Sequence, residues 1–434
     1  MKTRAMFCLL FLCVGPTLGI SQNRPEPISG PTSVLVKAGK LLDIIQGSYV
    51  ENAGIWIEGE RIKEVGRLAD IQAHVPKDAK IIDLSRYTVL PGLIDCHTHL
   101  MARIPEGPDG YTLNLATKSQ AFRALEGAYD ARVTLQAGFT TVRDVENEGS
   151  GYADVALRDA IDQGLVEGPR MQVATRAIAA VGQYNPFGVS PDLLEFPTGA
   201  QMVSGVEEAR RAAREQIGHG ADLIKIYADW ANPTLTTEEM RAVVEEAHKQ
   251  GRKVAAHAGT AEGIRNALNA GVDSIEHGDD VDRTTLQMMK EKNVFWVLTK
   301  GLAFDRLQRV TDPQRRKRLE EYLQRTREKL AVARELGVKI ANGSDASTPN
   351  THGKNAIEIV AATGLGLPPL EGIRAATVNA AELMGWQDRV GSLEPGKFGD
   401  LIAMEGDPLA NIRVLQNVKF VIKGGVVMKD VISR

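Results

Sequence analysis

The stretch Val89–Leu100, which reads VLPGLIDCHTHL, decides the fold. It begins with apolar residues typical of a buried strand, passes a Pro-Gly pair and ends on two histidines, His97 and His99. Side chains two apart on a strand point to the same face, so both imidazoles leave the strand together at its carboxyl end. Two unrelated surface histidines are the alternative, but the chain has only 8 His in 434 residues. The pair therefore predicts half of a metal site.

Further candidate ligands are placed in or just after other short apolar runs. Lys225 lies within LIKIY, His257 ends KVAAH, His277 ends SIEH, and Asp345 follows IANGS. Ligands at the carboxyl ends of different strands are the way a β/α barrel builds its active site. We therefore predict an α/β fold, a (β/α)8 TIM barrel with strands at 89–96, 140–145, 170–175, 223–228, 253–258, 273–277, 295–299 and 339–344. Helices are expected between them, for example at 121–137, 205–218, 237–250 and 261–270.

Both ends of the chain have a different pattern, of short strands with glycine at the breaks. Such runs lie at 33–36, 48–57, 62–66 and 81–84, and again at 400–404, 418–423 and 425–428. Glycine-punctuated runs of this kind are typical of hairpins. We predict that residues 32–88 and 391–434 build one small β-sandwich domain, with the barrel at 89–390 inserted between them.

The first 19 residues have a charged start, a short apolar core and small residues at their end, which predicts a secretory signal peptide. The apolar run is too short to span a bilayer. Residues 20–31 are polar and proline-rich, and we expect an unstructured lead-in there. The mature protein is then expected to be secreted or periplasmic, without membrane attachment. It would keep Cys96 as its one cysteine, so no internal disulfide can form, and alternation along the strand turns Cys96 away from the histidines.

Charge and composition exclude several classes of partner. The net charge of −3 and pI near 6.3 give no reason to expect nucleic acid or an anionic membrane. Residues 306–335 are rich in arginine, but acids and leucines are interleaved with the basic residues. This favours a solvated amphipathic helix over a nucleic-acid patch.

The motifs PGLIDCHTHL, GFTTVRDV, LIKIYA, AAHAGT, SIEHGDD, NGSDA and GSLEPGKFGDLIAMEGDPL together resemble the metal-dependent amidohydrolase superfamily, from about residue 30 to the end. The chain is most similar to its imidazolonepropionase-related group of prolidases and Xaa-Arg/Lys or aromatic carboxypeptidases, which includes amidases acting on ochratoxin. The resemblance implies a small-molecule amide or dipeptide substrate, a homo-oligomer and two metal ions. His97 and His99 would bind the more buried ion with Asp345, His257 and His277 would bind the second, and a carboxylated Lys225 would bridge them.

Lys225 is the sharpest single indication of chemistry. A charged lysine inside LIKIY would be costly to bury, whereas a neutral amine can react with carbon dioxide to give a carbamate, an oxygen ligand. The alternative is an amine that reaches the barrel mouth. Imidazole and carboxylate ligands suit Zn²⁺ best and leave Mn²⁺ or Co²⁺ open. The resemblance implies attack by a metal-bridging hydroxide, with Asp345 as general base and then acid.

Substrate contacts rest on fewer residues. Tyr227 shares the inward face with Lys225, and its hydroxyl is a candidate for the substrate carboxylate, the alternative being a core aromatic. Arg143 lies at the end of the second strand and Arg176 just past the third, and either could grip a carboxylate bidentately, although an Arg143–Asp144 ion pair is favoured for the first. Relatives often carry a histidine in the loop after strand three, where this chain has VGQYNP, so their contacts do not transfer directly. The remaining candidates are Gln183 and Tyr184 in that loop, and His352 after the eighth strand.

We therefore predict a binuclear zinc amidohydrolase that cleaves the C-terminal amino acid from small N-acyl amino acids or dipeptides. A cyclic-amide hydrolase, imidazolonepropionase-like or hydantoinase-like, remains open. A deaminase is disfavoured, because such relatives tend to lack the lysine at strand four and to carry His-x-x-Glu, whereas His257 is followed by AGT. A non-catalytic binding protein is disfavoured because all six ligands are present.

Overall fold

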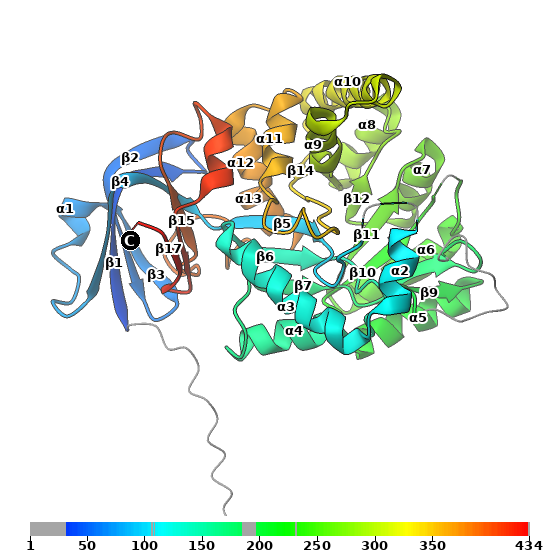
Figure 1. The fold of residues 1–434 in the computed structure, drawn as a ribbon, viewed down its shortest axis with the longest axis horizontal. Helices are drawn as coiled ribbons and strands as arrows, with labels where there is room; N and C mark the ends of the chain where they lie inside the picture. The colour runs from blue at the N-terminus through cyan, green and yellow to red at the C-terminus, as the bar shows by residue number, and fades with distance from the viewer. Residues whose placement is uncertain (1–31, 106, 108, 185–196, 231, 433–434) are drawn as a thin grey trace, which may run out of the picture.

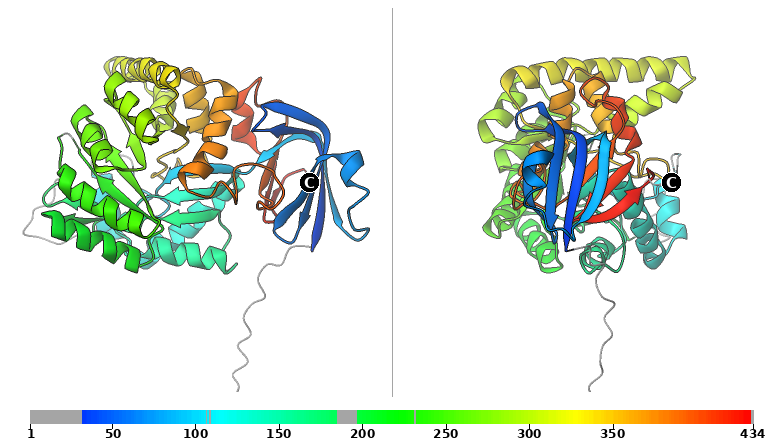
Figure 2. Two further views of the ribbon diagram at one scale, coloured as in Figure 1. Left: turned by 180° about the vertical axis from the view of Figure 1, so that it is seen from behind. Right: turned by 90° about the vertical axis from the view of Figure 1, so that its left-hand side faces the viewer.

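The computed structural model describes residues 32–105, 107, 109–184, 197–230 and 232–432. The predicted signal peptide and lead-in lie outside the described residues. Figure 1 shows a β-rich part made from both ends of the chain beside a larger α/β part that holds the middle of the chain. In the views of Figure 2, helices cover the outside of the larger part and its strands lie within.

The larger part is a barrel-like arrangement of parallel strands. One sheet has the order β5-β6-β7 and the other the order β14-β13-β12-β11-β10-β8-β9. Backbone hydrogen bonds join the sheets on both sides: Cys96 N donates to Asn342 O, and Asp222 N donates to Val173 O, each at 2.8 Å. The strands are β5 (Leu93–Thr98), β6 (Phe139–Asp144), β7 (Arg170–Val173), β8 (Ala177–Ala180), β9 (Ala200–Val203), β10 (Leu223–Tyr227), β11 (Lys253–Ala258), β12 (Ser274–His277), β13 (Phe295–Val297) and β14 (Ile340–Ala341).

The eight predicted barrel strands all have a counterpart, with two corrections. The first predicted strand is divided, because β4 (Lys80–Pro91) belongs to the other part and β5 begins only at Leu93. Gly92 lies at the division, where a Cβ atom would come within 2.0 Å of Thr140 Oγ1, so only glycine fits. The eighth strand is shorter than predicted, since the chain leaves the sheet after Ala341 to form the loop that carries Asp345.

The four helices predicted as examples are present as α3 (Gln120–Gln136), α5 (Val206–Gly218), α6 (Thr237–Lys249) and α7 (Ala261–Ala270). Thr236 caps α6 by accepting from Glu239 N, and the Glu239 side chain returns a bond to the cap backbone. Gly251, at φ +68°, ends that helix. The other helices of this part are α2 (Gly110–Thr117), α4 (Ala153–Asp162), α8 (Arg283–Lys292), α11 (Ile357–Gly364), α12 (Pro369–Ala375) and α13 (Val378–Leu383).

The arginine-rich segment forms two helices where one was predicted. These are α9 (Gly301–Arg309) and α10 (Pro313–Leu336). The break is at the proline, because Asp312 accepts from Arg315 N as a helix cap and proline is well suited to the first helical position. Leu323 and Leu330 are buried, so α10 is amphipathic as predicted.

Strands from both chain ends form one mixed seven-stranded sheet of order β17-β16-β15-β4-β1-β2-β3. β4 joins the two ends, pairing parallel with β1 on one side and antiparallel with β15 on the other. The two ends thus meet as predicted, while the second layer of a sandwich and the exact domain boundaries stay predictions. The other strands are β1 (Ser33–Asp43), β2 (Ser48–Glu58), β3 (Arg61–Arg67), β15 (Leu401–Met404), β16 (Phe420–Lys423) and β17 (Val426–Asp430), with short helices α1 (Leu68–Ile71) and η1 (Ile412–Asn417).

The core of the barrel confirms the orientation of Cys96. Its side chain is fully buried among Ile94, Val297 and Ala341, on the face of β5 opposite the histidines. Burial raises the pKa of the thiol to about 12. Within the described ranges, no helix combines the length and the apolar composition needed to cross a bilayer.

Candidate metal and active site

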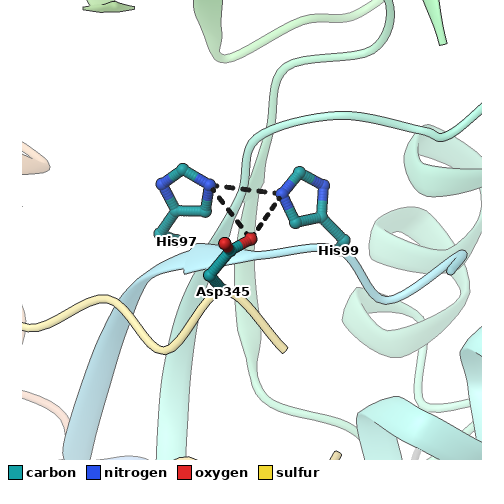
Figure 3. Close-up of side chains that lie close together, drawn as sticks. All are labelled: His97, His99 and Asp345. Carbon is teal, nitrogen blue, oxygen red and sulfur yellow. Dashed lines mark hydrogen bonds and ion pairs between the residues drawn. The ribbon is translucent and has the colours of Figure 1, made fainter. Parts of the chain in front are cut away.

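Three candidate ligands converge at the carboxyl end of the barrel. The ligand atoms of His97, His99 and Asp345 all lie within 4.8 Å of one another. His97 Nε2 lies 3.2 Å from His99 Nε2. Asp345 Oδ1 lies 3.6 Å from His97 Nε2 and 3.3 Å from His99 Nε2. Figure 3 shows the two rings and the carboxylate pointing at one common point.

The backbone holds Asp345 in this position. Its φ of +56° is unusual for a non-glycine residue, and its N–H donates to His97 O at 2.9 Å. The buried Asp95 carboxylate accepts from Ser344 N at 2.9 Å and from Asn355 Nδ2 at 2.8 Å. These bonds tie β5 to the loop after β14, so the histidines and Asp345 are fixed relative to one another.

Glu276 on β12 orients His97 from behind. Its Oε2 lies 2.7 Å from His97 Nδ1, and its Oε1 accepts from Arg143 at 2.7 Å. Burial alone would raise the pKa of Glu276, but Arg143 and His97 hold it below the ordinary range. An ionised carboxylate only accepts, so His97 carries its proton on Nδ1 and turns an Nε2 lone pair toward Asp345 and His99.

His99 contacts a second carboxylate, which the sequence interpretation missed. Glu148 Oε1 lies 2.8 Å from His99 Nδ1, and Glu148 itself is in a left-handed conformation at φ +53°. Burial alone would lower the pKa of His99, but Glu148 and Asp345 raise it well above its ordinary value. The same two carboxylates would attract a metal ion in place of that proton.

Lys225, His257 and His277 line the same cavity as the first three residues. The His277 ring lies 5.0 Å from that of His97 and 4.5 Å from that of His257, between ring centroids. His277 Nδ1 lies 2.7 Å from Thr299 Oγ1, which fixes the ring. Lys225 is almost fully buried, and burial lowers the pKa of its amine, which favours the neutral form that a carbamate requires.

The donor set fits divalent metal ions. Four imidazoles and a carboxylate oxygen are borderline to hard ligands, the chemistry that Zn²⁺, Mn²⁺ and Co²⁺ accept. Burial is the largest cause that lowers the pKa of His97 to about 4 and of His257 to about 3, so both rings are neutral at neutral pH. A neutral ring offers a lone pair, and the His97 and His99 nitrogens 3.2 Å apart are best satisfied by a shared cation.

The cavity at this site has a volume of about 380 Å³, and one of its walls is aromatic. Tyr227 stacks on Trp230 with ring centroids 4.8 Å apart, and Tyr184 packs against Tyr227 at 5.2 Å. The cavity is lined by His97, His99, Ile104, Tyr111, Thr112, Glu148, Gln183, Tyr184, Lys225, Tyr227, Trp230, His257, His277, Asp345 and Ser347.

A buried carboxylate, Glu146, stands behind the aromatic wall. It accepts from the hydroxyl of Tyr184 and, at 2.5 Å, from that of Tyr227. Burial and then the neighbouring Glu148 raise the pKa of Glu146 to about 7. The Tyr227 hydroxyl has one proton and gives it to Glu146, so in this geometry it has none to offer a substrate carboxylate.

The structure places three predicted substrate residues outside the cavity. Arg143 is buried under the site and donates to Cys96 O, Ser274 Oγ and Glu276. It therefore does not face the substrate, and its ion-pair partner is Glu276 and not Asp144 as predicted. Arg176 donates to Ala200 O at 2.7 Å. The His352 ring is buried with Nε2 2.7 Å from Ala102 O. Gln183, Tyr184 and Tyr227 do line the cavity.

Glu146, Glu148, Tyr111 and Trp230 were missed in the sequence. The acidic pair had a readable signal, because it follows β6 directly and therefore reaches the carboxyl end of the barrel with the other strand ends. Trp230 lies three residues beyond β10 and had the same signal. Tyr111 begins a helix, α2, far from any predicted strand, and no sequence signal points to it.

Comparisons with known proteins agree with this geometry. Residues 88–428 match the model of the amidohydrolase family. The chain is 31% identical to an ochratoxinase of Aspergillus niger, over 94% of this chain and 90% of that protein, and 24% identical to an imidazolonepropionase of Shouchella clausii, over 89% of each. The structure of a Xaa-Pro dipeptidase with methionine bound in its active site superposes with a TM-score of 0.80 at 34% identity, over 91% of this chain and 99% of that one.

Proposed function

Because the chain belongs to the amidohydrolase family, we propose that it is a metal-dependent amide hydrolase that releases the C-terminal amino acid from small N-acyl amino acids or dipeptides. The observation that carries the proposal is the meeting of His97, His99 and Asp345 with Lys225 and two further histidines at one cavity. The likeness to an ochratoxinase and to a Xaa-Pro dipeptidase supports the choice of an amide bond next to an amino acid.

Two Zn²⁺ ions are the cofactors that we propose, with Mn²⁺ or Co²⁺ as substitutes. His97, His99 and Asp345 would hold one ion, His257 and His277 the other, and Lys225, carboxylated by carbon dioxide, would bridge the two. When bound, the ions supply an activated water molecule and neutralise negative charge on the carbonyl oxygen.

The residues of the chain have separate tasks in this reaction. Asp345 accepts a proton from the attacking water and returns it to the leaving nitrogen, because its partly exposed carboxylate is aimed at the centre of the site. Glu276 holds the His97 ring in the tautomer that a ligand needs. The aromatic wall of Tyr184, Tyr227 and Trp230 packs against the apolar portion of the substrate and excludes water.

Turnover of matched substrate pairs tests the proposal. The zinc-loaded protein is given N-acetyl amino acids and dipeptides, each beside its carboxyl-amidated twin, together with a cyclic imide. Cleavage of the free acids with weak cleavage of the twins supports a carboxypeptidase-type enzyme. Asp345→Asn should abolish turnover, whereas the matched control Arg176→Gln, outside the cavity, should not. Cleavage of the imide alone would make the protein a cyclic-amide hydrolase, like the imidazolonepropionase relative.

We also propose export and self-assembly. The first 19 residues have the pattern of a signal peptide, so the amino-terminal sequence of the protein from a secreting host should begin after that segment. Assembly into a homo-oligomer is expected from the family, and the mass of the purified protein in solution tests it. A non-catalytic binding relative would have lost metal ligands, so bound-metal analysis separates it from the enzyme.

A further inference from the structure

A second cavity adjoins the active-site cavity and is rich in arginine. We call it the arginine groove and define it by Ile104, Arg306, Arg309, Arg315, Ser347 and Thr348, which line a volume of about 720 Å³. Ile104 and Ser347 also line the active-site cavity. Ile104 N donates to Ser347 O at 2.9 Å, so this bonded pair forms the rim between the two cavities.

The three arginines differ in their partners. Arg309 is paired with Asp305 on its own helix, α9, at 2.5 Å. Within the part of the chain that the structure describes, no acidic side chain pairs with Arg306 or Arg315. Asp312, the nearest acid in sequence to Arg315, accepts from its backbone N–H at 2.6 Å as a helix cap. Among the described residues, the groove therefore has two arginines, Arg306 and Arg315, that make no ion pair with an acidic side chain.

The active-site cavity has a different set of charged side chains. Lys225 is the one lysine or arginine among the described residues that line it, and that amine is the bridging ligand in the proposed site. Glu148 and Asp345 bring negative charge, and Glu146 lies behind the wall. Two bound Zn²⁺ ions would offset this negative charge, but the cavity offers a substrate carboxylate no guanidinium group, and the groove that shares its rim holds Arg306 and Arg315.

The topology also gives a direction to a bound substrate. The aromatic wall follows β8 and β10, whereas the groove is formed by segments after β5, β13 and β14. In the sheet order β14-β13-β12-β11-β10, the strands β10 and β14 stand four apart. The aromatic wall and the groove thus follow strands that are not neighbours, and the Ile104–Ser347 rim connects the groove to the active-site cavity.

We propose that Arg306 and Arg315 determine specificity by binding a carboxylate of the substrate that extends over the Ile104–Ser347 rim into the arginine groove. This inference rests on the proposed function, which identifies the ligand as an acyl amino acid. The carboxylate has two sources of the same chemistry, the α-carboxylate of the leaving amino acid or an acid on the acyl group. A guanidinium recognises either one in the same way, through paired hydrogen bonds.

Four ligands separate the two sources. These are N-acetyl-L-phenylalanine, N-succinyl-L-phenylalanine and the α-carboxamide of each. The charge on the amino acid and the charge on the acyl group are thus varied independently. The zinc-loaded wild type is compared with a double variant, Arg306→Gln with Arg315→Gln. The matched control is Arg316→Gln. Arg316 lies on α10 like Arg315, but it is ion-paired with Glu320 and does not line the groove.

The expected result is a KM about tenfold higher in the double variant, with kcat unchanged. Only the ligands that carry the recognised carboxylate should show this increase. Selectivity for the free acids over the amides identifies the α-carboxylate, and selectivity for succinyl over acetyl ligands identifies the acyl group. The effect should shrink at high salt in the wild type, since the guanidinium groups are exposed. Equal KM values in wild type and double variant, or equal losses in the Arg316→Gln control, would overturn the inference.

The same ligands distinguish this failure from failure of the proposed function. If the wild type cleaves some of them and the double variant behaves identically, the function stands and the groove plays no part. If the wild type cleaves none, the ligands stay intact, and titration calorimetry then gives their Kd values directly. Weaker binding of the charged ligands to the double variant supports the groove in that case, and equal binding refutes it.

Discussion

Replacing Arg143 by methionine separates a structural role for this residue from the substrate role that its position in the sequence predicted. The Arg143 guanidinium and the Glu276 carboxylate are 1% and 0% exposed and lie 2.7 Å apart. Removing one partner of a buried ion pair leaves the other charge without compensation, at a cost of about 3–5 kcal/mol. Arg143 also donates to Cys96 O and Ser274 Oγ. We therefore expect the free energy of unfolding to fall by about 4 kcal/mol.

Urea denaturation followed by tryptophan fluorescence measures this loss. The metal-free protein is used, so that release of metal does not contribute. Arg176→Met is the matched control, because that guanidinium is partly exposed and donates to a single carbonyl, Ala200 O. Its loss should be about 1 kcal/mol. If Arg143→Met lowers the free energy of unfolding by less than about 1 kcal/mol and also raises KM, then Arg143 contacts substrate and the structural assignment is refuted.

The pH dependence of the free energy of unfolding provides a second test of the same variant. The pKa of Glu276 is lowered in the folded protein, against the effect of burial, chiefly by Arg143. A lowered pKa stabilises the fold above the pKa of the unfolded glutamate, about 4.3, and this stabilisation is lost as the pH falls through the folded value. Arg143→Met removes the main cause of the lowered pKa, so the variant should lose less stability than the wild type as the pH falls below about 4.3. Parallel pH curves would contradict this account.

Three further predictions concern residues on separate elements. Lys225→Ala should lower kcat for amide cleavage by at least about 100-fold, since the proposed bridging ligand is lost, and a variant that retains turnover would exclude the carbamate. Cys96 should resist a thiol reagent in the native protein and react after denaturation, because it is buried and its pKa is about 12; rapid native labelling would contradict its placement. Thr236→Ala should cost about 1 kcal/mol in urea denaturation through loss of the capping box of α6, and an unchanged midpoint would show that the box contributes nothing.

The ligand positions were predictable because strand geometry is strongly determined by sequence. Alternation in β5 places His97 and His99 on one face and Cys96 on the other, and both orientations are found. Parallel strands bring their carboxyl ends to the same edge, so Lys225, His257 and Asp345 could be assigned to one site although they lie far apart in sequence.

The partners of those ligands were not predictable in the same way. The pairing of Glu276 with Arg143 depends on the register of strands that are not neighbours in the sheets, and short apolar runs do not specify that distance. Arg143 at a strand end therefore resembled a substrate contact, although its side chain turns under the site. Glu276 shares the inward face of β12 with Ser274, which donates to its carboxylate, and polarity alone did not distinguish this position from the surface.

The extent of individual elements was also set by tertiary contacts. The sequence predicts one strand at 89–96, but the close approach of Thr140 at Gly92 divides it between the two sheets. Asp345 adopts a left-handed conformation that is uncommon for a residue other than glycine, and the bonds made by Asp95 hold the loop in place. Neither contact is local in sequence.

The metal content of the purified protein tests the central claim most directly. Elemental analysis of the zinc-loaded wild type and of the double variant His97→Asn with His257→Asn should be combined with amide-cleavage assays before and after chelation. The account predicts two divalent ions per chain in the wild type, loss of both metal and turnover in the variant, and turnover that disappears with a chelator and returns with Zn²⁺. Full amide cleavage by metal-free protein would contradict it.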